Sequence, residues 1–105
     1  MEKKYMKYNK LVRDKIPEYI REKGEKAISH IAGDKEYWEK LKEKFIEEVN
    51  EFNKAENPDE LADVLEVIDA IIDYKKFDRS EIKNIKEKKV QKRGAFKDRV
   101  ILDES

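Results

Sequence analysis

The amino-acid sequence predicts an all-α protein built on two long antiparallel helices. Apolar residues recur at helical spacing in two stretches, from Trp38 to Phe52 and from Leu61 to Ile72, and residues three or four apart share one face of a helix. Because only a few residues separate the stretches, the helices must be antiparallel neighbours. The 105 residues make one small domain, and with 38% apolar residues its core is lean.

The first predicted element is a short helix. Pro17 suits its first turn, and Gly24 ends it after about Lys23. Ala27–Ile31 alternates between apolar and polar residues and predicts a short strand.

The two long helices have recognisable starts. Asp34 is a suitable N-cap for a helix over about residues 35–54. Asn57, followed by Pro58, starts a second helix that runs to about Tyr74.

The C-terminal part is dominated by charge. Asp78 can cap a third helix from about Ser80 to Gln91, and a glycine-bearing loop follows it. Arg99–Leu102 is a candidate terminal strand. A two-stranded ribbon with Ala27–Ile31 is one option, although such a ribbon is only marginally stable without helices behind it.

Charge is unevenly distributed, although 25 acids balance 25 bases. Residues 46–74 hold ten acids and one base, whereas residues 75–99 hold eleven bases and four acids. The acidic block is too rich in aliphatic residues for a disordered tail. The basic block is either a phosphate-binding element or a solvated surface.

Several classes are excluded by composition. The chain has no cysteine, so it has neither a disulfide framework nor a thiolate metal site. No apolar run approaches the roughly 20 residues that a bilayer span needs, and the N-terminus lacks the apolar stretch of a secretory signal. We therefore expect a soluble cytoplasmic protein without membrane contact.

Acidic side chains flank the apolar stripes of both long helices. They form the pattern E-E-x-x-E, eight residues and E-x-x-D, which comprises Glu47, Glu48, Glu51, Glu60 and Asp63. Carboxylates at that density repel one another, so a cation is expected among them. Hard divalent ions that prefer oxygen ligands, above all Mg²⁺, are the natural candidates.

Two of these acids also have structural interpretations. Glu47 is placed to form an ion pair with Lys44 or Lys54. Glu60 stands three residues after Asn57, which is the reciprocal position of a capping box and needs no metal.

Five segments together resemble a known family. Lys44–Glu51 and Glu60–Val67 are similar to the all-α nucleoside triphosphate pyrophosphohydrolases, which include MazG, phosphoribosyl-ATP pyrophosphohydrolase and the dimeric all-α dUTPases. Tyr8–Pro17, and Lys92–Phe96 followed by Val100–Leu102, resemble a small MazG-like branch described as house-cleaning enzymes for noncanonical nucleotides. The resemblance spans nearly the whole chain.

One position departs from the family pattern. Ala95 stands where a second glycine is often found in the late loop, so the geometry of this loop is in doubt if it requires a glycine there.

The resemblance implies Mg²⁺-dependent hydrolysis of a nucleoside triphosphate to the monophosphate and pyrophosphate. By motif position, the implied metal ligands are Glu47, Glu48, Glu51 and Asp63. Glu60 is implied either as a further ligand or as a residue that positions a ligand. Glu48 is also a candidate base for the attacking water. The candidate phosphate contacts are Arg13, Lys15, Lys44, Lys92 and Arg93.

An antiparallel helix pair exposes a long apolar seam. We expect two copies to cover it by forming a four-helix bundle, as a homodimer or a dimer of dimers. The identity of the base, the number of metal ions and the pathway stay open.

Two other functions compete with hydrolysis. Residues 75–99 could bind nucleic acid through their positive charge, but they contain few aromatic residues for base stacking and leave the acidic helices unexplained. A non-catalytic helical adaptor that keeps the fold is the other alternative.

Overall fold

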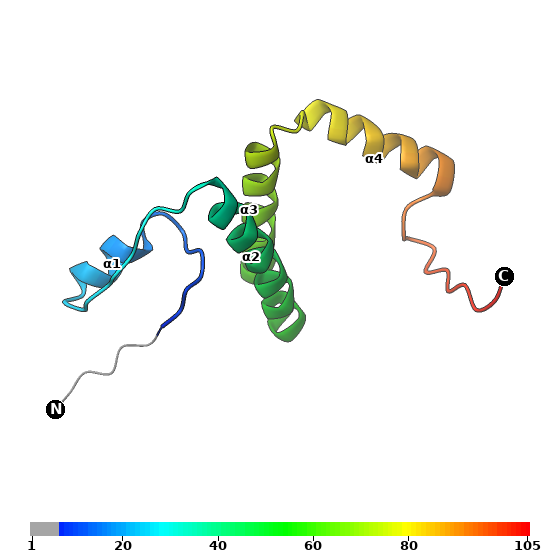
Figure 1. Cartoon of the computed structure of the whole chain (residues 1–105). Coiled ribbons are helices and arrows are strands. Elements are labelled where there is room, and N and C mark those ends of the chain that lie inside the picture. The colour runs from blue at the N-terminus through cyan, green and yellow to red at the C-terminus, as the bar shows by residue number, and fades with distance from the viewer. Residues whose placement is uncertain (1–6) are drawn as a thin grey trace. The chain divides into compact units, whose positions relative to one another are not determined.

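The computed structural model describes residues 7–105, and these residues form four helices (Figure 1). The helices are α1 (Ile16–Glu22), α2 (Asp34–Ala55), α3 (Pro58–Lys75) and α4 (Arg79–Arg93). The prediction of an all-α fold is confirmed, since no strand occurs between residues 7 and 105. No helix in this range is long and apolar enough to cross a membrane.

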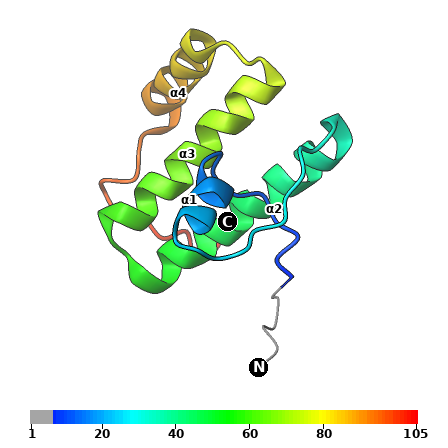
Figure 2. The same ribbon diagram turned by 90° about the vertical axis from the view of Figure 1, so that its left-hand side faces the viewer.

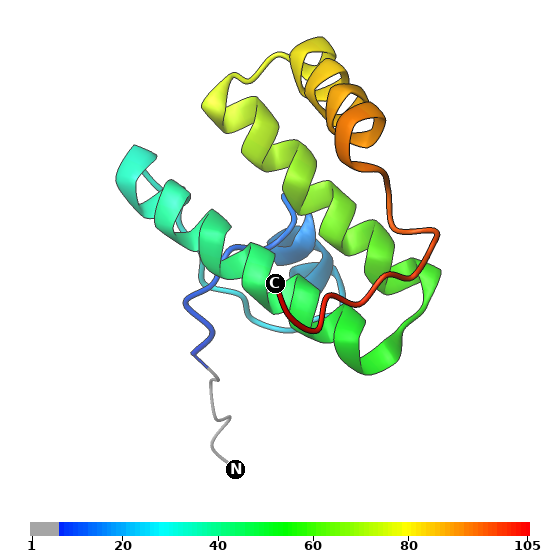
Figure 3. The same cartoon turned by 90° about the vertical axis from the view of Figure 1, so that its right-hand side faces the viewer.

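The chain divides into two compact units, Met1–Ile71 and Ile72–Ser105. The first unit contains α1, α2 and most of α3, and the second contains the end of α3, α4 and the C-terminal segment. In the first unit, α2 and α3 lie side by side and run in opposite directions, as the short connection predicts (Figures 2 and 3).

A tight turn joins α2 to α3. Glu56 takes the left-handed conformation at φ 48° and ends α2, with its N–H donating to the Phe52 carbonyl at 2.7 Å. The Asn57 side-chain oxygen then accepts a hydrogen bond from the Glu60 N–H at 2.8 Å, which confirms Asn57 as the N-cap of α3. This turn places the first turn of α3 beside the last turns of α2.

The other helix boundaries differ in one respect from the prediction. Asp78 caps α4 by accepting from the Ser80 and Glu81 N–H groups, as expected, and Gly24 follows α1 at φ 81°. The predicted capping role of Asp34 is wrong, because Asp34 is the first residue of α2 and Gly33 occupies the cap position without a side-chain hydrogen bond. Asp34 there still lies where the helix dipole favours negative charge.

The buried core is small. Among the described apolar residues, only Leu41 on α2 and Val64 and Val67 on α3 are buried. Helices α1 and α4 contribute no buried residue. Packing of α2 against α3 is therefore the main source of apolar burial in the first unit.

The two segments predicted as strands are irregular here. Ala27–Ile31 belongs to the first unit and residues 99–102 to the second. A strand is defined by hydrogen bonds to a partner strand, so the ribbon between these segments stays a prediction.

Candidate metal and phosphate site

One face of α2 forms the floor of a cleft in the first unit. Tyr37, Leu41, Lys44 and Glu48 follow one another at intervals of four, three and four residues, so they share that face. The cleft has a volume of about 680 Å³. Helix α3 contributes Asp63, Glu66, Val67 and Ala70, and the remaining lining comes from Leu11, Val12, Arg13, Asp14, Lys15, Ile16 and Tyr19.

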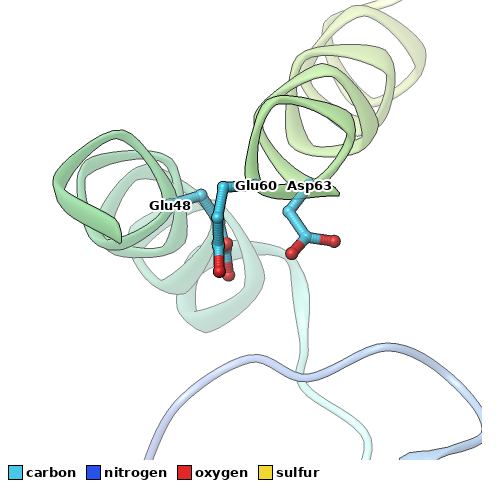
Figure 4. Close-up of side chains that lie close together, drawn as sticks. All are labelled: Glu48, Glu60 and Asp63. Carbon is cyan, nitrogen blue, oxygen red and sulfur yellow. The ribbon is translucent and has the colours of Figure 1, made fainter. Parts of the chain in front are cut away.

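Three carboxylates meet where α2 and α3 face each other, and two of them, Glu48 and Asp63, line this cleft. Glu48 on α2 and Glu60 and Asp63 on α3 each offer an oxygen, and these oxygens lie within 4.8 Å of one another (Figure 4). We call this group the acid cluster. All three residues are half-buried, because the antiparallel packing brings the last turns of α2 against the first turn of α3.

Basic side chains hold two members of the acid cluster. Lys44, one helical turn before Glu48, lies 3.3 Å from its carboxylate. Arg13 comes from the segment before α1, and its Nη2 donates to Asp63 Oδ1 at 2.7 Å. These pairs compensate part of the negative charge that the cluster concentrates.

Glu47 lies outside the acid cluster and has two basic partners. Lys10 donates to its carboxylate at 2.8 Å, and Lys44 lies at 3.4 Å. The hydrogen bond from Lys10 lowers the pKa of Glu47, and the positive charge of Lys44 adds to this effect against the opposing influence of burial. The same contact raises the pKa of Lys10.

Glu60 is in the opposite electrostatic situation. Loss of solvent contact raises the pKa of its carboxyl, and the neighbouring charges of Asp63 and Glu51 raise it further. Its backbone N–H donates the capping hydrogen bond to the Asn57 side-chain oxygen, while its carboxylate lies in the acid cluster (Figure 4). Glu60 therefore experiences the excess negative charge of the site.

The other predicted residues fall into three groups. Glu51 is exposed and stands outside the acid cluster, although its charge acts on Glu60. Lys15 lines the cleft. Lys92 and Arg93 occupy the last turn of α4 in the second unit, so their phosphate contacts stay a prediction.

Lys10 and Glu66 are among the residues of the site that were not assigned from the sequence. Lys10 reaches Glu47 across 37 residues, and no local pattern links them. Glu66 lines the cleft one helical turn after Asp63. The spacing of Glu66, three residues after Asp63 on the same helix, was the sequence signal that could have predicted its place. For Lys10 the only signal was its position in the segment Tyr8–Pro17.

Comparison with known proteins returned no match, whether among protein-family models, curated proteins or solved structures.

Proposed function

We propose that this protein is a Mg²⁺-dependent pyrophosphohydrolase that converts a nucleoside triphosphate to the monophosphate and pyrophosphate. One observation carries the proposal: three carboxylates from two helices converge, and two of them line a cleft that Arg13, Lys15 and Lys44 also line. Phosphoryl chemistry requires carboxylates that bind a divalent ion and positively charged side chains that bind phosphate oxygens. The MazG-like motifs of the sequence support the same activity, including a house-cleaning role on noncanonical nucleotides.

The donor set of the acid cluster fits a divalent metal ion. Magnesium binds oxygen ligands at about 2.0–2.1 Å, so two ligands of one ion lie at most about 4.2 Å apart. The cluster oxygens lie within 4.8 Å of one another, and half-buried carboxylates can close that difference by small rotations. Glu48, Glu60 and Asp63 would hold the ion, and Glu47 and Glu51, one helical turn apart on α2, would serve a second one.

Each residue has a part in the proposed reaction. The bound metal supplies charge neutralisation at the phosphate oxygens. Lys44 and Lys15 bind phosphate oxygens along the cleft, and Arg13 does so with its planar fork. Glu48 lines the cleft, and the motif position that makes it the candidate base supports a role in orienting the attacking water and accepting its proton.

The protein acts as a homodimer or a dimer of dimers. Ile46, Leu61 and Leu65 are 60%, 44% and 54% exposed, and we call them the open face. Ile46 lies two residues from both Lys44 and Glu48, and Leu61 and Leu65 each lie two residues from Asp63. Two residues correspond to about 200° around a helix, so the open face points away from the cleft. A second α2–α3 pair covers it in a four-helix bundle. We propose that the protein acts on nucleoside triphosphates in the cytoplasm.

Pyrophosphate release tests the activity. A panel of ordinary and modified nucleoside triphosphates is incubated with Mg²⁺ or with chelator, using wild type, Glu48→Gln and Glu43→Gln. Glu43 is a matched control on α2, because it is exposed and pairs with Lys40 outside the cleft. We expect metal-dependent release by wild type and by the control, and its loss in Glu48→Gln by at least about 100-fold.

Release that survives chelation, or that Glu48→Gln retains, would contradict this assignment of the site. No release from any nucleotide in the panel would count against the activity and favour the non-catalytic adaptor.

A further inference from the structure

The positive charges at the acid cluster are anchored in two different ways. Lys44 belongs to α2, pairs with residues one turn ahead on the same helix and is only 16% exposed. Arg13 belongs to the non-helical segment before α1 and is 57% exposed, yet it makes the shorter contact, 2.7 Å to Asp63. Lys44 is therefore fixed by its helix, whereas Arg13 is held at the site mainly by its partner.

Asp63 cannot serve Arg13 and a divalent ion equally well. A carboxylate that already accepts a charge-assisted hydrogen bond has less negative charge to offer, and two cations on one carboxylate repel each other. Arg13 thus competes with metal for Asp63. Release of Arg13 from Asp63 disturbs little packing, because Arg13 is more than half exposed and its backbone is outside any helix.

Arg13 is also placed to bind phosphate. It lines the same cleft as Lys15 and Lys44, where the proposed function places the triphosphate. A guanidinium matches the geometry of two phosphate oxygens as well as it matches a carboxylate. The same side chain can therefore neutralise Asp63 in the free protein and phosphate in the complex.

We propose that Arg13 is an exchangeable counter-ion, which holds Asp63 in the metal-free protein and transfers to the triphosphate when Asp63 binds metal. The inference rests on the proposed function and deepens it, because it makes metal and nucleotide binding mutually dependent. Metal without nucleotide must displace Arg13 without compensation. Metal with nucleotide gains the contact between Arg13 and phosphate.

Metal binding without nucleotide is the first measurement. Free Mn²⁺, a spectroscopic substitute for Mg²⁺, is titrated by electron paramagnetic resonance against the full chain as wild type, Arg13→Gln, Arg13→Lys, Asp63→Asn and Lys40→Gln. Lys40 is the matched control, because it forms a comparable pair with Glu43 outside the cleft. Arg13→Gln should bind Mn²⁺ about two- to fivefold tighter than wild type, the range that a partly exposed ion pair allows.

The other variants have their own expected Mn²⁺ affinities. Arg13→Lys keeps the charge and should stay near wild type, Lys40→Gln should be unchanged, and Asp63→Asn should bind more weakly. Binding of an α,β-methylene nucleoside triphosphate with Mn²⁺ present should weaken in Arg13→Gln, with partial recovery in Arg13→Lys. Opposite effects of one substitution on metal and nucleotide are not expected if Arg13 only supports the fold.

Unchanged or weaker Mn²⁺ binding by Arg13→Gln would overturn the exchange, as would a wild type that binds no Mn²⁺. Failure of the proposed function is separately visible, since Mn²⁺ binding needs no turnover. Tighter binding by Arg13→Gln in a protein that hydrolyses no nucleotide would reject the activity and leave the competition between Arg13 and metal in place.

Discussion

The surroundings of Glu60 disfavour the charged form of its carboxyl. Its pKa is raised from the ordinary value of 4.5 by loss of solvent and by nearby carboxylates, whereas Glu48 and Asp63 have basic partners at 3.3 and 2.7 Å. Relief of charge repulsion is therefore expected first at Glu60.

Replacing Glu60 with Gln should stabilise the metal-free protein at neutral pH. A raised native pKa means that the native state binds more protons than the unfolded chain, so stability falls as pH rises through the window from 4.5 upwards. The substitution removes this loss of stability. The stabilities of wild type and Glu60→Gln should converge in acid, where the carboxyl of Glu60 is protonated in both the native and the unfolded state. Thermal unfolding across pH with chelator present measures this; a lower Tm for Glu60→Gln at neutral pH would show that the acid is structural.

Glu47→Gln should have the opposite effect and lower the stability of the protein at neutral pH. The pKa of Glu47 is lowered, chiefly by the hydrogen bond from Lys10, so its contribution is present above the unfolded value of 4.5 and is lost as pH falls through the lower native value. We expect a loss of at most about 1 kcal/mol at neutral pH, since the pair is partly exposed. Urea unfolding checks it, and a double-mutant cycle with Lys10→Gln should show coupling between the two residues.

Among the elements, the turn between α2 and α3 is decisive for the site. It reverses the chain within two residues and brings Glu60 and Asp63 opposite Glu48. Asn57 holds this reversal through its 2.8 Å hydrogen bond to the Glu60 N–H. The cap therefore links local helix formation to the geometry of the acid cluster.

Asn57→Ala should lower stability by about 0.5–2 kcal/mol, the usual loss of an N-cap, and should also weaken Mn²⁺ binding. Asp78→Ala is the matched control, because Asp78 caps α4 in the same way in the second unit. It should lose similar stability and keep its metal affinity. Equal effects of both substitutions on metal binding would mean that general destabilisation, and not the α2–α3 turn, is responsible.

At the scale of the whole molecule, few apolar side chains are buried among residues 7–105. Only three apolar residues among those described are buried, and a domain of this size with so small a core is marginal as a monomer. Association through the open face would supply the missing apolar contact. The proposed dimer would therefore stabilise the fold as well as define the assembly.

The double substitution Leu61→Glu and Leu65→Glu should convert the proposed dimer to monomers, because it places charges in the apolar seam. Sedimentation velocity at micromolar concentration distinguishes the two states. Ile28→Glu is the control, since Ile28 is exposed but lies outside the open face. A wild type that sediments as a monomer would contradict the proposed assembly.

The helix content and the helix order follow from the sequence, because apolar spacing and the caps Asn57 and Asp78 are local signals. The same spacing places Glu48 and Asp63 at the edge of the apolar stripes. The partners of these acids depend on contacts distant in sequence. Arg13 reaches Asp63 across 50 residues and Lys10 reaches Glu47 across 37, and no periodicity encodes such pairs. The packing of α2 on α3 also selects Glu48, Glu60 and Asp63 from five similar acids, because convergence depends on how two helices meet and not on either helix alone.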